Sequence, residues 1–251
     1  MNFASLFIPT PRRNTARYTG LLYLLMAITA AFSLLAMPSV VVVKNDAVTT
    51  LSNLLQHEVL VRCVIVSHLA SHGLFILLAT TFYRLFKGVH DWSGRLLVVF
   101  VVAQVPLVFM GEVFNYAALM IAKGNLLPSV QGAQNLALKA DAVMFLLKLR
   151  SYSLLTAQVF WGLWLIPLGR LAFASGFMPR VLGILLILAG IAYLLQTSTD
   201  ILVAEPNANA FVSALDKVYG AVQSIAEIAM ILWLVSIGTL EKSTSSQVSE
   251  A

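Results

Sequence analysis

The sequence predicts an all-α fold, an integral membrane bundle of about six transmembrane helices with two outer interfacial helices. Of its 251 residues, 59% are hydrophobic and 11% are charged, whereas soluble domains average about 25% charged residues. Six apolar segments reach or approach the roughly 20 residues that cross about 30 Å of hydrocarbon. Lys and Arg lie at the ends of these segments rather than in one stripe, so the net charge of +5 indicates membrane topology and not nucleic-acid binding.

The six predicted spans follow one another along most of the chain. In chain order they cover residues 18–37, 63–82, 96–122, 154–173, 181–199 and 218–239. We expect residues 1–17 to form a cytoplasmic N-terminal segment, residues 18–240 the transmembrane domain, and residues 241–251 a disordered cytoplasmic tail. The arginines before the first span resemble those of a signal peptide. The apolar run is too long, however, and no small-residue cleavage site follows it, so we expect this helix to be retained.

Two further helices are expected outside the spans. Asp46 is suited to cap a short helix that places Leu51, Leu54 and Leu55 on one face. Ser129 is suited to open a second helix, in which apolar residues recur at helical spacing over residues 130–147. Both helices are expected to lie in the outer membrane interface and to cover the ends of the spans.

A short basic turn joins the fourth and fifth spans between Arg170 and Arg180. Within it, Gly176 is expected to end one helix in a left-handed conformation, and Pro179 to open the next. Beyond the turn, Gly183 and Gly190 are expected to let the fifth helix pack closely against a neighbour. The turn is therefore predicted to be a tight cytoplasmic connection between two closely packed helices.

The distribution of basic residues predicts the orientation. Nine Lys and Arg residues lie on the face that holds both termini and the short turns, and seven lie on the opposite face, four of them in one long loop. Long loops are translocated largely regardless of their charge, so the short turns decide the orientation. We therefore predict a multi-pass protein of the bacterial cytoplasmic (inner) membrane with both termini in the cytoplasm.

Four ionisable residues fall inside the predicted spans, where each costs about 2.5–3.5 kcal/mol and needs a partner or a water-lined cavity. Glu112 shares one arc of its helix with Gln104 and Asn115, and Glu227 follows Gln223 by one turn. A pair of histidines four residues apart lies in the second span. With the predicted orientation all four fall in the outer half or near the middle of the membrane, where they are expected to share one polar pocket. The candidate ligand-binding residues are Glu112, Asn115, Gln223, Glu227, His68 and His72.

Other interpretations of these residues stay open. Intramembrane Glu and Gln side chains also form hydrogen bonds that hold neighbouring helices together. The pair of His68 and His72 is more simply explained by helix packing, because a metal site needs a third ligand. We therefore predict no metal and no cofactor.

Tyr23 and Trp164 are interpreted as interfacial aromatic residues. The single Cys63 excludes an intramolecular disulfide, and neither a phosphate-binding loop nor a nucleophile elbow occurs.

Several motifs together point to a known family. They are the lead-in of the first span over residues 17–25, the outer-loop pattern from Asn45-Asp46 to Arg62, the densest block from Phe160-Trp-Gly-Leu to Tyr193, and Glu227 with Leu232-Trp-Leu234. In these motifs the chain resembles the bacterial membrane family called domain of unknown function 4386, over most of its length. The resemblance implies a multi-helix bacterial inner-membrane protein without an assigned activity.

Three functions remain from the sequence. The favoured one is binding, or gated passage, of a small or lipid-like molecule through the polar intramembrane pocket. The second is a membrane enzyme acting on a lipid or isoprenoid with Glu112 or a histidine as general base, which a cavity open sideways to lipid would favour. The third is a structural or accessory subunit, which a packed bundle without a cavity would favour. The expected partners are membrane lipids and a small hydrophobic or amphipathic ligand; the sequence does not indicate an oligomeric state.

Overall fold

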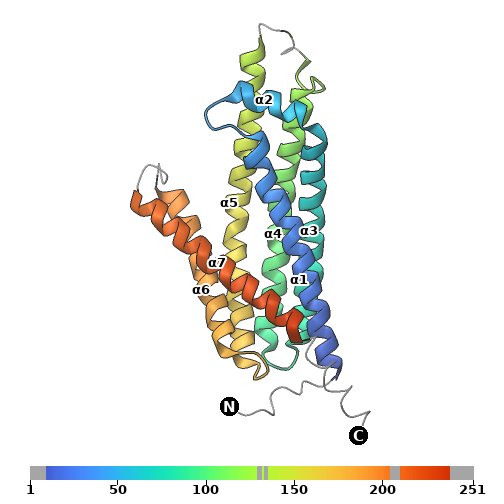
Figure 1. The fold of residues 1–251 in the computed structure, drawn as a ribbon, viewed down its shortest axis with the longest axis vertical. Coiled ribbons are helices and arrows are strands. Elements are labelled where there is room, and N and C mark those ends of the chain that lie inside the picture. The colour runs from blue at the N-terminus through green and yellow to red at the C-terminus, as the bar shows by residue number, and fades with distance from the viewer. Residues whose placement is uncertain (1–9, 129–131, 133–134, 204–209, 238–251) are drawn as a thin grey trace, which may run out of the picture. The chain divides into compact units, whose positions relative to one another are not determined.

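The computed structural model describes residues 10–128, 132, 135–203 and 210–237, and these form helices joined by short connections (Figure 1). The helices are α1 (Thr10–Ala36), continued by a short π-helical segment (Met37–Val41), α2 (Ala47–Gln56), α3 (Glu58–Leu85), α4 (Asp91–Ala122), α5 (Leu136–Ala174), α6 (Arg180–Leu202) and α7 (Ala210–Ile237). All of them except α2 are long and apolar enough to cross a membrane. The described residues contain no strand. The prediction of an all-α, multi-pass membrane bundle is confirmed.

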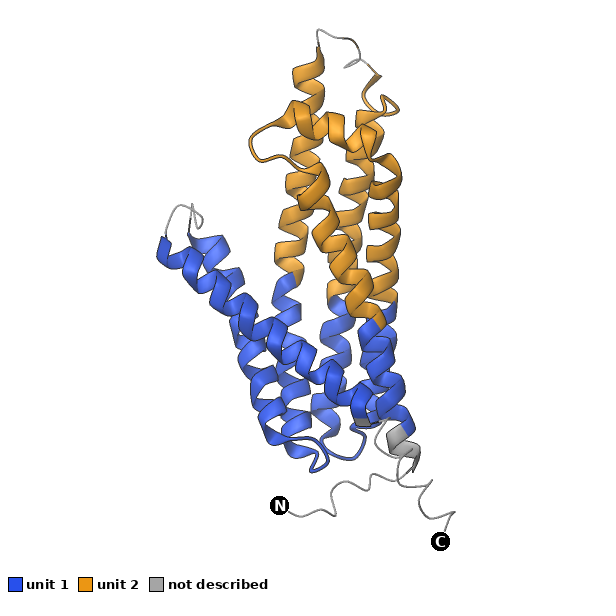
Figure 2. Ribbon diagram, in the orientation of Figure 1, with its two compact units in different colours: residues 1–24, 74–103, 158–251 blue, residues 25–73, 104–157 orange. Residues whose placement is uncertain are grey.

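The chain divides into two compact units (Figure 2). Unit 1 comprises Met1–Leu24, Leu74–Ala103 and Gln158–Ala251, and unit 2 comprises Leu25–Gly73 and Gln104–Ala157. The tail predicted for residues 241–251 lies outside the described residues, as do residues 1–9 of the predicted N-terminal segment. The first helix begins at Thr10, well before the predicted span.

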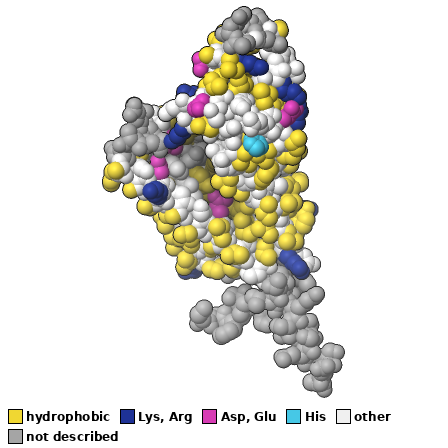
Figure 3. All heavy atoms as spheres, turned by 45° about the horizontal axis from the view of Figure 1, so that its top comes forward, with side chains coloured by type: hydrophobic (Ala, Val, Ile, Leu, Met, Phe, Trp, Pro, Cys, Tyr) yellow, Lys and Arg dark blue, Asp and Glu magenta, His cyan; other side chains and the backbone are white. Residues whose placement is uncertain are grey.

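Apolar side chains remain exposed along all of the long helices. Examples are Leu35, Val66, Val113, Leu188 and Leu232, each more than 45% exposed. Figure 3 shows a broad area of hydrophobic side chains on the face in view. A surface of this kind is favourable when the surrounding solvent is lipid, so it agrees with the membrane assignment.

The short helix α2 begins as the sequence predicts. Asp46 accepts hydrogen bonds from the backbone N–H of Thr49 at 2.9 Å and from its hydroxyl at 2.6 Å. These bonds hold the pKa of Asp46 below its usual value. Leu51 and Leu54 pack into the core of unit 2, whereas Leu55 is exposed, so two of the three predicted leucines face inward.

The second outer helix is not a separate element, and this prediction is wrong. Ser129 lies outside the described residues, and from Leu136 a single helix of 39 residues runs to Ala174. The mostly polar residues 148–153 were expected to separate two helices, but no Gly or Pro occurs between Leu136 and Gly162 to break one. The helix accommodates the charge of Arg150 because a partner for it lies on α4. The predicted apolar face is nevertheless buried in unit 2, through Ala140 and Leu147 among others.

Within unit 1, the C-terminal part of α5 and the helix α6 touch through glycines. A Cβ atom added at Gly162 would lie 2.7 Å from the carbonyl oxygen of Gly190, and one added at Gly169 would lie 2.6 Å from that of Gly183. Only glycine permits backbones to approach so closely. The close packing expected at Gly183 and Gly190 is confirmed. In the turn between the helices, Gly176 has a φ of 72°, the predicted left-handed conformation.

Candidate functional site

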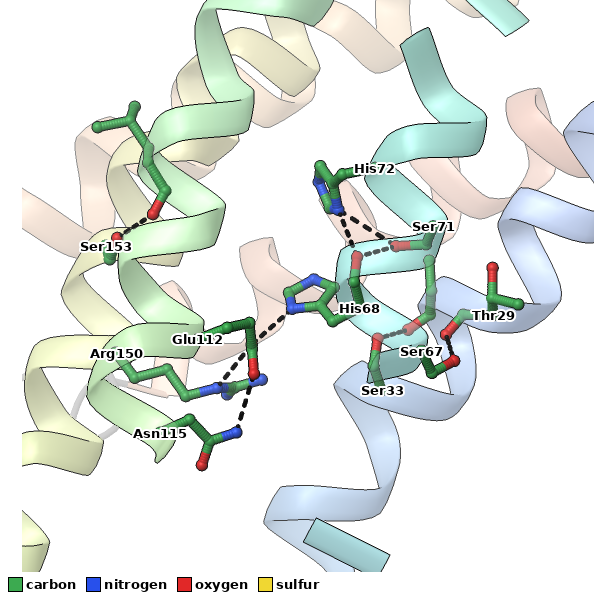
Figure 4. A network of polar contacts seen from close by, with 12 residues as sticks. Thr29, Ser33, Ser67, His68, Ser71, His72, Glu112, Asn115, Arg150 and Ser153 are labelled. Atoms are coloured by element: carbon green, nitrogen blue, oxygen red, sulfur yellow. Dashed lines mark hydrogen bonds and ion pairs between the residues drawn. The ribbon is translucent and has the colours of Figure 1, made fainter. Parts of the chain in front are cut away.

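Glu112 is the centre of a buried polar cluster in unit 2 (Figure 4). Its Oε1 accepts hydrogen bonds from Nδ1 of His68 on α3 at 2.7 Å and from Nε of Arg150 on α5 at 3.2 Å. Its Oε2 accepts from Nδ2 of Asn115, one turn along α4, at 3.0 Å. The Glu112 side chain is 2% exposed, that of His68 is fully buried, and that of Arg150 is 9% exposed. Three helices thus contribute to one carboxylate.

Several buried polar atoms of unit 2 have no hydrogen-bond partner among the described residues. They are His68 Nε2, Asn115 Oδ1, Arg150 Nη2 and both side-chain polar atoms of Gln104. All four side chains are more than nine-tenths buried. Leaving a buried donor or acceptor unpaired costs about 1–3 kcal/mol. Buried polar atoms of this kind are satisfied by water or by a polar group of a ligand.

The histidine pair is held by the helix that carries it. The rings of His68 and His72 meet edge to face, with centroids 5.0 Å apart. Nδ1 of His72 lies 3.1 Å from the backbone oxygen of His68 and 3.2 Å from the hydroxyl of Ser71. In the described part of the chain, no three His, Cys, Asp or Glu side chains are grouped closely enough to hold a metal ion. The contacts with Ser71 and with the backbone of His68 therefore position the ring of His72, and the hydrogen bond to Glu112 positions the ring of His68.

An apolar groove of about 510 Å³ lies between α3 and α4 of unit 2. Its volume is within the range of about 300–1,000 Å³ that small-molecule sites occupy. Glu112 is the one carboxylate among its lining residues, and Val113 and Tyr116 on the same wall are each more than 45% exposed, so the groove opens on the surface of the unit. The lining residues are Ile65, Leu69, Phe109, Glu112, Val113, Tyr116, Ala117, Met120 and Leu126.

Glu227 has a different set of partners, in unit 1. Its Oε2 accepts a hydrogen bond from the hydroxyl of Tyr23 on α1 at 2.9 Å, and its Oε1 accepts one from the hydroxyl of Tyr193 on α6 at 3.0 Å. One turn earlier on α7, Nε2 of Gln223 donates to Oε1 of Gln196 at 2.9 Å. Both carboxylate oxygens of Glu227 are thus occupied by protein groups, which is the arrangement of a residue that joins helices.

The predicted site residues are therefore divided between the two units. His68, His72, Glu112 and Asn115 come together in unit 2, and Gln223 and Glu227 belong to unit 1. A single pocket that contains both carboxylates stays a prediction.

Sequence reasoning missed Arg150, Tyr23 and Tyr193 as partners of the carboxylates. Arg150 lies between residues 130–147 and 154–173, which were expected to form two separate helices, and the uninterrupted run of helix-forming residues around it was the signal for a single helix. Tyr23 and Trp164 were expected at the interface, but both are buried and their rings lie 6.0 Å apart in the core of unit 1. The position of an aromatic residue near the end of a span does not by itself show whether its side chain lies at the membrane interface or in the core.

The family model described as Domain of unknown function (DUF4386) matches residues 18–238, which include all the site residues described above. No curated protein and no solved structure matches the chain. Because the family model covers most of the sequence, the resemblance inferred from the motifs is confirmed, and the chain belongs to the DUF4386 family.

Proposed function

We propose that this protein binds a small or lipid-like molecule at Glu112 and that the molecule enters from the bilayer through the groove between α3 and α4. The observation that carries the proposal is that Glu112 belongs both to the buried cluster and to the lining of the groove. It is the hydrogen-bonding centre of the buried cluster and also the one carboxylate that lines the groove. Apolar walls with a few convergent polar groups are the usual composition of a ligand site.

The chemistry of Glu112 indicates which polar group the ligand carries. The carboxylate accepts three hydrogen bonds from the protein, and an ionised carboxylate has about four acceptor positions. The remaining position suits a donor, such as a hydroxyl group. The rest of the groove is lined by hydrocarbon, so the rest of the ligand is expected to be a hydrocarbon chain.

We infer that the protein acts in the bacterial cytoplasmic membrane with both termini in the cytoplasm. The support is the charge of the short connection between α3 and α4, where Arg84, Lys87 and Arg95 lie within twelve residues. Short loops rich in Lys and Arg are retained on the cytoplasmic side.

The proposal is tested with two neutral probes, methyl stearate and the same ester with a mid-chain hydroxyl. The fraction of purified protein that carries each ester is measured by native mass spectrometry in detergent. We expect the hydroxylated ester to bind about threefold more tightly, because a hydrogen bond within a membrane protein contributes roughly 0.6 kcal/mol. In a variant with Glu112→Leu and Arg150→Met, which removes both charges together, this preference should disappear. Equal binding of the two esters by the wild type would contradict the proposal.

A second candidate function is an enzyme that acts on a lipid. The observation that favours it is the contact of 2.7 Å between His68 Nδ1 and Glu112, which leaves Nε2 of His68 without a protein partner. A histidine oriented in this way by a carboxylate is a common general base. The same experiment separates the candidates, because an enzyme changes the mass of the bound molecule with time and a binding protein does not.

A further inference from the structure

A cationic cluster of Glu58, Arg62 and Lys123 lies in unit 2, outside the site described so far. The carboxylate of Glu58 accepts hydrogen bonds from Nζ of Lys123 at 2.7 Å and from Nε of Arg62 at 2.8 Å. Two cations therefore share one carboxylate, and the cluster has one positive charge in excess. The side chains of Arg62 and Lys123 are 43% and 32% exposed, so both remain accessible from outside the protein.

This cationic cluster is continuous with one end of the apolar groove. The guanidinium of Arg62 lies 5.9 Å from the ring centroid of Tyr116, which lines the groove. Lys123 follows the last turn of α4, and the lining residues Met120 and Leu126 flank it in the sequence. The cationic cluster thus lies beside one end of the groove, and the carboxylate of Glu112 lies about three turns earlier along α4.

The spacing of these two features matches the depth of one membrane leaflet. Glu112 and Lys123 are eleven positions apart in the chain, which corresponds to roughly 16 Å along a helix at about 1.5 Å per residue. The hydrocarbon core of a bilayer is about 30 Å thick, so one leaflet contributes about half of that distance. A chain that extends from the cationic cluster to Glu112 therefore has the length of a lipid chain within one leaflet.

We propose that the groove takes a single-chain anionic amphipath of the bilayer, a long-chain carboxylate whose charged group binds between Arg62 and Lys123. This inference rests on the proposed function, in which a hydroxyl on the same chain donates to Glu112. The excess of one positive charge matches a monoanion, and the volume of the groove suits one small molecule. The walls of the groove are no more apolar than surrounding lipid, so the charged end supplies the selectivity.

The test compares stearic acid with methyl stearate, which differ in charge and share the same chain. Binding to the purified full-length protein is again measured by native mass spectrometry. We expect the wild type to prefer the acid. A variant with Arg62→Gln and Lys123→Gln should lose that preference, because each basic residue removed should weaken binding of the acid by about fivefold. The matched control carries Lys139→Gln and Lys148→Gln on α5, which removes the same total charge away from the groove, and it should keep the preference.

Three results would overturn the inference. The first is equal binding of acid and ester by the wild type. The second is an equal loss of the preference for the acid in the two double variants. The third is unchanged binding of the acid when Ala117→Phe narrows the groove without altering any charge. Failure of the proposed function appears separately, because the two neutral esters report only on the hydroxyl contact with Glu112. A preference for the acid that persists in the Glu112→Leu and Arg150→Met variant would support the cationic cluster even if the hydroxyl had no effect.

Discussion

Arg150 and Glu112 are 38 residues apart in the chain and form a buried ion pair, in which Nε of Arg150 donates to Oε1 of Glu112 at 3.2 Å. The two residues come from α5 and α4 of unit 2. Removing one member of a buried pair leaves the other charge uncompensated, at a cost of about 3–5 kcal/mol, whereas replacing both by apolar residues is often neutral. The pair therefore determines how variants of Glu112 behave.

The first prediction concerns this ion pair. Glu112→Leu alone and Arg150→Met alone are each expected to lower the free energy of unfolding by about 3 kcal/mol. The double variant is expected to recover most of the loss, because no charge is left unpaired. Thermal unfolding of the wild type, the two single variants and the double variant in the same detergent gives the interaction energy of the pair as a double-mutant cycle. Additive losses in the double variant would show that the two charges do not interact.

The second prediction concerns the tyrosines that donate to Glu227. Tyr23→Phe and Tyr193→Phe each remove one donor from a carboxylate oxygen and should each lower stability by about 1–3 kcal/mol. Tyr152→Phe is the matched control, because that side chain on α5 is 61% exposed, and it should leave the unfolding temperature unchanged. If all three variants unfold at the wild-type temperature, Glu227 does not join the helices.

The third prediction concerns the contact between α5 and α6. Gly162→Ala places a methyl group 2.7 Å from the carbonyl oxygen of Gly190, and overpacking of this kind costs about 1–3 kcal/mol. Gly73→Ala in α3 is the control, because no atom beyond the adjacent backbone of its own helix lies within 4 Å of the added methyl. Unfolding in detergent should separate the two variants, and equal stability would mean that the helices are less closely packed than described.

The fourth prediction isolates backbone conformation from packing. A methyl group at Gly176 or at Gly220 meets no atom within 4 Å, but Gly176 has a φ of 72° and Gly220 lies within the helix α7. Gly176→Ala is expected to destabilise by about 1–2 kcal/mol, and Gly220→Ala to stabilise by about 0.5–1 kcal/mol. Opposite shifts of the unfolding temperature are expected. Shifts of the same sign would contradict the left-handed turn.

The fifth prediction concerns orientation. Fluorescent protein fused after the C-terminus should fluoresce in bacterial cells, because both termini are predicted to be cytoplasmic. Alkaline phosphatase inserted at Asn125, in the connection after α4, should be active because that connection is predicted to lie outside. The reverse pattern would show that the protein is inserted the other way round.

The predictable features are those that depend on nearby residues. Hydropathy over one span, the cap at Asp46 and the left-handed Gly176 each follow from a few consecutive side chains, and all three are present. The continuous helix α5 was missed because Lys and Arg after an apolar stretch usually end a span. Arg150 can be buried because Glu112 on a different helix pairs with it. The spacing of residues along one helix does not predict a contact between two helices.

The same limit applies to the candidate site. Spacing along α4 grouped Glu112 with Asn115, and the hydrogen bond of 3.0 Å between them agrees with that grouping. The tyrosines of Glu227 were not predicted, because Tyr23 and Tyr193 are 170 residues apart and meet only in the folded unit. Burial makes a partner necessary for an intramembrane carboxylate, but it does not specify which residue serves as the partner.

The ion pair of Glu112 and Arg150 also bears on how the protein responds to membrane voltage. The opposite charges lie close together and sum to zero, so an electric field across the bilayer exerts almost no net force on the pair. Replacing Glu112 alone by Leu would leave Arg150 as a net positive charge, and the potential acts on a charge with about 2.3 kcal/mol per 100 mV for a full crossing. Loss of this one carboxylate would therefore convert a voltage-insensitive site into a voltage-sensitive one.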